Sequence, residues 1–503
     1  MKLPMIHTAL RCAAFGALLM TGWSMAQIGD GPIIREHMDQ AQIENGSLDF
    51  WQIFDHGELL FAAKFNTYDG QGRPGTTGTG AAREPGSAPA FIRTSAPESN
   101  SCAGCHNDPV RGGAGDIVAN VFVLAQAADP VQDSVMATFS NERNTLGMHG
   151  AGLIEMLSRE MTADLHAVRD LAVAQAAETN ASVTLSLDTK GVNFGTITAA
   201  ADGTLDTSAV DGVDADLIIK PFHQKGVVVS LREFSNNAMN HHHGMQSTER
   251  FGMARTGTKD FDQDAVEDEL TVGDITAISV WQAALGTPGQ IIPNDAPRAR
   301  AILRGERLFK DIGCESCHVS SLTLNDPVFS EPNPYNPEGN LVPAETTAVY
   351  TWDMTVLGQG PLPRKNHLGQ VEVRAFTDLK RHNLCDDDYS HFCNEQLVQA
   401  GVPTEEFLTR KLWDVGSSAP FGHRGDLTTM TEAIHYHGGD ARASRDQYFA
   451  LPQRQRDEIV EFLKSLQILP RDAQSLIVDE NGQAKNRNRV VRKNAPVQRD
   501  VME

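Results

Sequence analysis

Positive charge is scarce in this sequence, and long hydrophobic runs are absent beyond its first 26 residues. The 503 residues contain 43 Lys and Arg against 65 Asp and Glu, which gives a formal net charge of −22. Such an acidic chain is a poor partner for nucleic acid. A transmembrane helix needs about 20 consecutive apolar residues, so we do not expect the remainder of the chain to span a membrane. Its length allows roughly two or three domains.

The first 26 residues have the pattern of a secretory signal peptide. Lys2 and Arg11 form the basic start, the apolar core runs from Cys12 to Trp23, and residues 24–26 (Ser-Met-Ala) resemble an A-x-A cleavage site. An uncleaved membrane anchor is the alternative, but about a dozen apolar residues are few for a span. We therefore expect an exported, periplasmic protein whose net charge falls from −22 to −24 when these two basic residues leave with the signal.

Only seven cysteines occur, and four of them lie in two C-x-x-C-H motifs. This motif attaches a c-type haem, because each thiol adds to a vinyl group of one porphyrin and the adjacent histidine reaches the iron as proximal ligand. The run-up repeats as well, since G-E-x-L-F stands at 57–61 and at 305–309. The chain therefore has the pattern of two haem modules. The attachment residues are Cys102, Cys105 and His106 in the first module and Cys314, Cys317 and His318 in the second.

Zinc is the alternative occupant of these motifs. Four thiolates can bind one tetrahedral ion, but these pairs lie about 200 residues apart, whereas zinc motifs usually close short loops. Each pair is also followed by a histidine that tetrathiolate zinc does not need. We therefore predict two covalently bound haem c groups. Cys12 leaves with the signal, and in an oxidising compartment the remaining Cys385 and Cys393 are expected to form a disulfide, with a ligand role as the alternative.

Hydrophobic periodicity predicts a mainly α fold, and the two C-x-x-C-H motifs predict two cytochrome c-type haem domains within it. Helical spacing covers residues 48–65, 151–178, 298–310 and 454–466, whereas residues 182–199 alternate as in a β-hairpin. We expect four parts in the chain. These are the signal peptide (1–26), an N-terminal haem domain (27–294, with a β insertion at about 180–231), a C-terminal haem domain (295–470) and a polar, poorly ordered tail (471–503).

Several further motifs resemble, in this order, those of the bacterial di-haem cytochrome c peroxidase superfamily. More narrowly, the chain is similar to the di-haem oxidoreductase family, whose members are described as thiol oxidoreductases or peroxidases. Two positions depart from the family pattern, with Arg424 in place of Asp and Leu384-Cys385 in place of Met-Gly. The segments that carry the resemblance are R-N-T (143–145), G-A-G-L-I-E (150–155), T-D-L-K-R-H (377–382), A-P-F-G-H-R-G (419–425) and E-A-I-H-Y-H-G-G (432–439).

This resemblance implies a periplasmic di-haem oxidoreductase, peroxidase-like, with a reactive N-terminal haem and a C-terminal haem that transfers electrons. It makes Glu155 the candidate acid/base, Arg143 the candidate polarising group and His149 a candidate distal ligand or base. The alternatives for these three are a surface carboxylate, a salt-bridge partner and a loop histidine. Trp413 is either an electron relay between the haems or a core aromatic. Calcium is a further candidate cofactor.

His437 is the candidate sixth ligand of the second haem. Residues 429–432 (T-M-T-E) form a capping-box pattern that starts a short helix, and Gly438-Gly439 ends it. The superfamily has Met or Tyr at the corresponding position, so a histidine here predicts bis-His ligation. His423 is the second choice, and His435 projects from nearly the opposite side of the helix. One of the three consecutive histidines at 241–243 is a candidate for the neighbourhood of an iron, with a surface metal trap as the alternative.

The motifs leave the reaction open, because substrate does not follow from fold. Peroxide or another small oxidant is the expected partner, and the acidic surface favours a basic electron-donor protein. The alternative functions are a non-catalytic di-haem electron carrier, and an oxygenase or protein-modifying relative in the same superfamily.

Overall fold

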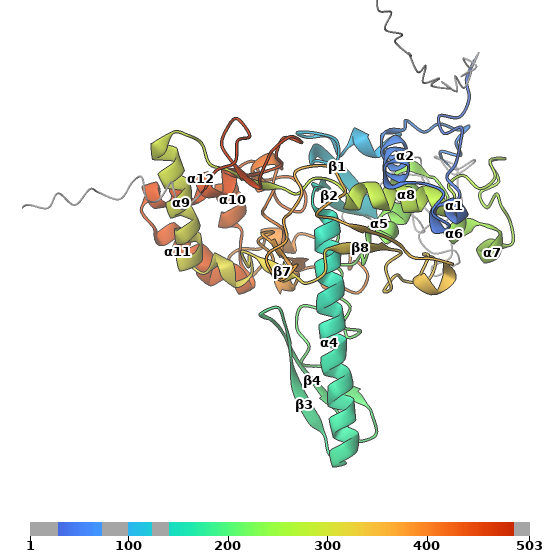
Figure 1. The fold of residues 1–503 in the computed structure, drawn as a ribbon. Coiled ribbons are helices and arrows are strands. Elements are labelled where there is room, and N and C mark those ends of the chain that lie inside the picture. Colours follow the sequence, from blue (N-terminus) through green and yellow to red (C-terminus); the bar gives the residue numbers. More distant parts are fainter. Residues whose placement is uncertain (1–28, 73–98, 123–139, 487–503) are drawn as a thin grey trace, which may run out of the picture. The chain divides into compact units, whose positions relative to one another are not determined.

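Two helix pairs support the C-x-x-C-H motifs in the computed structural model, which describes residues 29–72, 99–122 and 140–486 (Figure 1). In the first pair α2 (Phe50–Ala62) packs against α8 (Val272–Ala283). In the second pair α9 (Ala296–Asp311) packs against α12 (Gln453–Lys464). The leading helix of each pair carries the G-E-x-L-F segment, and all four helices belong to the unit that starts at Pro32.

The glycine of each G-E-x-L-F segment lets its helix pair approach closely. A Cβ at Gly57 would overlap the carbonyl oxygen of Ala277, and one at Gly305 would overlap that of Glu458. Both obstacles are backbone atoms of the partner helix, so they cannot rotate away. The repeat seen in the sequence is therefore a repeat of helix packing.

Gly305→Ala should lower the free energy of unfolding, by about 1–3 kcal/mol for an overpacked contact. The added methyl group would push α9 away from α12. Urea unfolding of the holoprotein measures the loss. Arg307→Ala, an exposed position on the same helix, should stay near wild type, and equal stability of the two variants would contradict this account of the packing.

Among the other described elements, α4 is the longest helix, and β1, β3 and β4 are the longest strands. The helices are α1 (Gln40–Glu44), α4 (Ala151–Thr179), α5 (Leu231–Ala238), α6 (Thr248–Phe251), α7 (Met253–Thr256), α10 (Met430–His435) and α11 (Arg442–Ala450). The strands are β1 (Gly115–Phe122), β2 (Ser140–Thr145), β3 (Val183–Thr189), β4 (Val192–Ala199), β5 (Leu205–Asp206), β6 (Gly289–Ile291), β7 (Leu322–Leu324), β8 (Val328–Glu331), β9 (Tyr350–Asp353), β10 (Val371–Val373), β11 (Arg381–Asn383), β12 (Glu406–Leu408), β13 (Leu466–Gln467) and β14 (Ile477–Val478).

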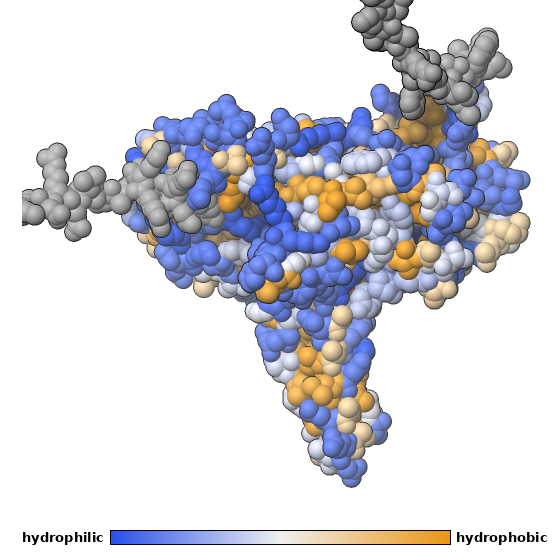
Figure 2. Space-filling model, in the orientation of Figure 1, coloured by the Kyte–Doolittle hydropathy of each residue, from blue (hydrophilic) through white to orange (hydrophobic). Residues whose placement is uncertain are grey.

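These bounds confirm the predicted helices and hairpin to within a few residues. Helix makes up 34% and strand 16%, and the strands form small sheets, so helix exceeds strand as predicted. The hairpin β3–β4 packs beside α4 (Figure 1). Hydrophobic residues reach the surface over this part (Figure 2), where Leu171 of α4 is half exposed.

A strap from the second half of the chain (residues 322–373) joins the core of the first half. Phe329 and Trp352 of the strap pack in the same hydrophobic core as Phe50 of α2. Glu331 of the strap pairs with the fully buried Arg232 of α5 at 2.5 Å. The residues on either side of the expected domain boundary at 294/295 thus share one core.

The predicted disorder of the tail from residue 471 is wrong for residues 471–486. Ile477 and Val478 form β14, which pairs in parallel with β6, and Val478 is fully buried. Two apolar residues suffice because the edge of β6 offers them backbone partners. The remaining tail and the predicted signal peptide lie outside the described residues. Within the part of the chain that the structure describes, no helix is both long and apolar enough to cross a membrane.

Candidate haem sites

One cavity of about 670 Å³ connects the two C-x-x-C-H motifs. All six motif residues lie on its wall, and each motif begins with the same 3₁₀ turn, Cys102–Gly104 or Cys314–Ser316. The rest of the wall is mainly apolar, as a porphyrin requires. Two thiol pairs and two histidines on one apolar cavity fit two covalently attached haems.

Each motif histidine is fixed through one ring nitrogen. His106 Nδ1 lies 3.0 Å from the carbonyl oxygen of Leu146, and His318 Nδ1 lies 3.1 Å from that of Phe376. These bonds make Nδ1 the protonated nitrogen and leave Nε2 as the electron-pair donor. Burial lowers the pKa of each histidine to about 4, so both rings are neutral ligands near pH 7.

The two histidines also have the same aromatic neighbour. Phe61 lies 6.2 Å from His106 with 52° between the ring planes, and Phe309 repeats both values against His318. Each phenylalanine ends a G-E-x-L-F segment. The sequence repeat therefore places a proximal ligand twice in one geometry.

His437 lies on the cavity wall of the second site, just beyond the end of α10. The predicted capping box at Thr429 is present, and His437 Nδ1 lies 2.7 Å from the carbonyl oxygen of Ala433. His437 and His318 line the same cavity, and the electrostatic influence of His437 helps to lower the pKa of His318. His437 therefore meets the conditions for a ligand opposite His318, and its ligation stays a prediction.

The other two histidines of this region have different surroundings. His423 also lines the cavity, with Nε2 2.9 Å from Asn394 Oδ1. His435 instead contacts the Tyr389 ring and Arg445, whose Nη2 lies 3.2 Å from its Nδ1. His435 is not among the described residues on the cavity wall, in agreement with its expected direction.

Arg143 lies on the wall of the shared cavity, three residues before Leu146, whose carbonyl accepts from His106. Its buried guanidinium has fixed partners. It pairs with Glu395 and donates to Gln399 Oε1 at 3.1 Å. Burial lowers the pKa of Arg143, and the nearby Glu395 carboxylate partly raises it again. The side chain stays a cation near pH 7.

Glu155 and His149 are buried but are not among the described residues that line the cavity. Glu155 pairs with Arg159 of the same helix. The ring nitrogens of His149 lie 3.1 and 3.4 Å from two backbone carbonyl oxygens, and burial lowers its pKa. The predicted site residues are thus divided, with Arg143 at the cavity and the other two behind its wall.

The three consecutive histidines lie over the first attachment site. They end a π-helix (Met239–His243), a form that often marks functional sites. His243 contacts Cys102, with Nε2 to Sγ at 3.3 Å, and the carbonyl of His242 accepts from the amide of Ser99 at 3.2 Å. His242 and His243 line the cavity, so a surface metal trap does not describe them.

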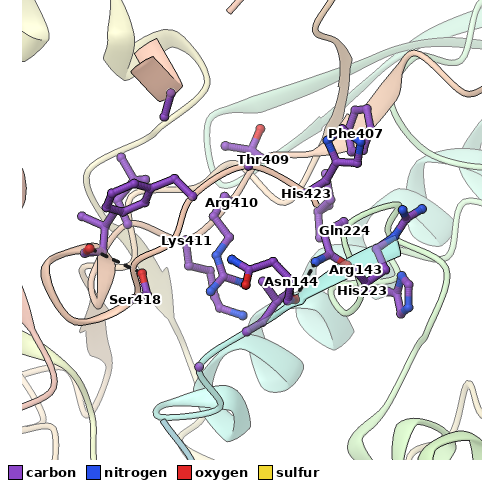
Figure 3. A pocket seen from close by; sticks show the side chains of 18 of the residues that line it. Arg143, Asn144, His223, Gln224, Phe407, Thr409, Arg410, Lys411, Ser418 and His423 are labelled. Atoms are coloured by element: carbon purple, nitrogen blue, oxygen red, sulfur yellow. Dashed lines mark hydrogen bonds between the residues drawn. The ribbon is translucent and has the colours of Figure 1, made fainter. Parts of the chain in front are cut away.

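Arg410 and Lys411 are cavity cations that the sequence analysis did not single out. Figure 3 shows their side chains extending toward Asn144 of β2. Burial lowers the pKa of Lys411 to about 8. Two cations on an apolar wall suit the propionate carboxylates of haem, and the only sequence signal is a basic pair beside Trp413 in an acidic chain.

Trp413 is buried between segments that hold the two motif histidines. Its ring packs so closely on Gly150 that a Cβ there would overlap it. Gly150 lies four residues after Leu146, whose carbonyl accepts a hydrogen bond from His106. Trp413 lies three residues after Arg410, whose backbone lies beside His318. The position suits both the relay and the core role.

The predicted disulfide between Cys385 and Cys393 is confirmed, with 5.9 Å between the Cα atoms. Calcium stays a prediction. The nearest observation is that Asp260, Asp262 and Asp264 bring carboxylate oxygens within 4.8 Å of one another, since oxygen is the donor type calcium takes.

The mature protein should exceed its chain mass by two haems. Thioether bonds survive acid–acetone, so intact mass and extraction test the attachment together. Cys102→Ala/Cys105→Ala should lose covalent attachment of one haem and keep the other. A single haem in wild type, or bound zinc, would contradict the assignment.

Comparisons with known proteins agree with the motifs. Residues 348–466 match the family model described as "Di-haem oxidoreductase, putative peroxidase", which confirms the resemblance for this part of the chain. No curated protein matches the chain. Hydrazine synthase of Kuenenia stuttgartiensis is 13% identical over 92% of this chain and 100% of that one, with a TM-score of 0.35. A MauG-like protein associated with microbial copper homeostasis is 17% identical over 58% and 81%, with a TM-score of 0.28. Neither TM-score supports a further argument.

Proposed function

We propose that this chain is a periplasmic di-haem c-type oxidoreductase that reduces peroxide at the first haem site and receives electrons through the second. The observation that carries the proposal is one cavity that joins two equivalent C-x-x-C-H sites. The family match supports the oxidoreductase class, and the Arg143 cation at the first site supports peroxide as oxidant.

Bound haem would supply the iron and the electrons at each site. Arg143, held by Glu395, would stabilise negative charge that develops on the departing oxygen. Trp413 would lie on the path between the sites. His106 and His318 hold their protons on Nδ1 and direct Nε2 to the cavity.

His223, unlike Glu155, could hydrogen-bond to a molecule in the cavity. It lies on the cavity wall, and its Nδ1 is 3.4 Å from Gln399 Nε2. Because the amide nitrogen donates, the ring carries its proton on Nε2. Burial lowers the pKa of His223 to about 3 and keeps it neutral. No sequence pattern indicates His223, since it follows the β-hairpin as an ordinary loop histidine.

A non-catalytic electron carrier is the second candidate function. Histidines line the cavity at both sites, His242 in the first and His437 in the second. If both coordinate, both irons are six-coordinate and no position is open for peroxide.

One spectrum separates the two functions. A peroxidase should show a high-spin ferric component, or a spectral shift with peroxide or cyanide that develops as a ligand leaves. Two haems that stay low-spin in excess of both reagents would overturn the enzymatic proposal and favour the carrier.

A further inference from the structure

Residues 384–395 contain the Cys385–Cys393 disulfide, and Leu384 and Phe392 of this segment line the cavity. We call it the disulfide segment. Its Phe392 lines the cavity, with ring centroids 5.9 Å from His437 and 5.5 Å from His423. Asn394, two residues after Phe392, accepts a hydrogen bond from His423 at 2.9 Å. The segment therefore forms part of the wall at the second haem site.

The N-terminal end of the disulfide segment holds the backbone beside His437. The amide of Gly438 donates to the carbonyl of Leu384 at 2.9 Å, and that of Gly439 donates to Asp386 at 3.0 Å. A Cβ on Gly438 would lie 3.1 Å from the Cα of Cys385. Contact this close means that the bridged cysteine limits where the His437 ring can lie.

The C-terminal end of the disulfide segment holds charges of the first half of the chain. Glu395 pairs with Arg143 of β2 and lies 3.4 Å from Lys225 Nζ, and all three side chains are nearly inaccessible to solvent. One carboxylate thus serves two buried cations. Burial lowers the pKa of Lys225 to about 8 while Glu395 opposes the shift. Loss of the carboxylate would leave both cations buried without it, which is strongly unfavourable.

We propose that the disulfide segment is a positioning element for both haem sites, holding Arg143 at the first through Glu395 and His437 at the second through Leu384 and Asp386. The assignment at the second site rests on the proposed ligation by His437. The bridge keeps the two ends of the segment together, so a displacement at one site is transmitted to the other by packed contacts and ion pairs.

Glu395→Gln tests the first contact in the holoprotein. Loss of an anion beside buried cations makes the surroundings more positive, which favours the reduced iron. We expect a redox titration to show a positive shift in the potential of the first haem. Asp387→Asn removes a carboxylate from the exposed surface of the same segment and should leave both potentials unchanged.

Cys385→Ser/Cys393→Ser tests the second contact. Electron paramagnetic resonance should show partial loss of the low-spin signal of the second haem, because Gly438 and Gly439 lose a fixed support. Thermal melting monitors folding, and if the double variant does not fold, the Glu395→Gln titration decides alone. An unchanged first-haem potential in Glu395→Gln, or a folded serine variant with its full low-spin signal, overturns the proposal. Wild-type protein that ignores peroxide would refute the peroxidase function without affecting either readout.

Discussion

His437→Ala is expected to convert one of the two haems from low spin to high spin and to leave the other unchanged. His437 lines the same cavity as His318, and its Nδ1 donates to the carbonyl of Ala433 at 2.7 Å. That bond leaves Nε2 as the ligand atom. Alanine removes the ligand and offers no replacement atom, so the second iron becomes five-coordinate or takes up water. Electron paramagnetic resonance and absorption spectra of the ferric holoprotein measure the change.

Two neighbouring histidines provide controls for this variant. His435→Ala, two residues earlier, should keep the wild-type low-spin signal because its ring contacts Tyr389 and Arg445. His423→Ala removes the other cavity histidine of this region, which is bound to Asn394. Full retention of low-spin signals in His437→Ala, together with their loss in His423→Ala, would transfer the ligand role to His423.

The elements that the sequence predicted are those whose cause is local. Helices α2, α4, α9 and α12 follow from apolar spacing, and the start of α10 follows from a capping box at Thr429. The strap at 322–373 was not predicted, because what holds it is long-range. The pair between Glu331 and Arg232 joins residues that no periodicity connects. Strand β14 was also not predicted, because its two residues form a strand only by pairing with the distant β6.

The residues of the site also divide into those that the sequence predicts and those that it does not. Attachment residues could be read from the sequence, because two thiols and a histidine at fixed spacing are needed for one covalent cofactor. The buried charges around the cavity could not be read from the sequence. Lys225 and Glu395 look like ordinary surface residues in the sequence, yet the fold brings them within 3.4 Å of each other without solvent. For Glu155 the resemblance indicates a catalytic role, whereas its contacts in the structure indicate a structural one.

Glu155→Gln should destabilise the protein more than it slows the reaction with peroxide. The carboxylate is fully buried and is bound by three donors, with 2.9 Å to Asn333 Nδ2, 2.9 Å to the amide of Leu231, and an ion pair with Arg159. Glutamine keeps the shape but replaces one acceptor oxygen by an NH₂ group, which must then face a donor. Arg159 also loses its counter-charge in the interior. Breaking such a pair costs about 3 kcal/mol, which urea unfolding of the holoprotein would measure.

The kinetic half of the experiment decides whether Glu155 also transfers a proton. Removal of a general acid or base slows a reaction by about 10²-fold or more. Leu231, which lies on the cavity wall, binds the Glu155 carboxylate through its backbone amide. This arrangement places Glu155 one residue behind the wall, where it supports Leu231 and the strap residue Asn333 rather than meeting peroxide. Stopped-flow rates of the variant should therefore fall by much less than 10²-fold. A loss of that size at unchanged stability and with an intact ferric spectrum would restore Glu155 as the acid/base.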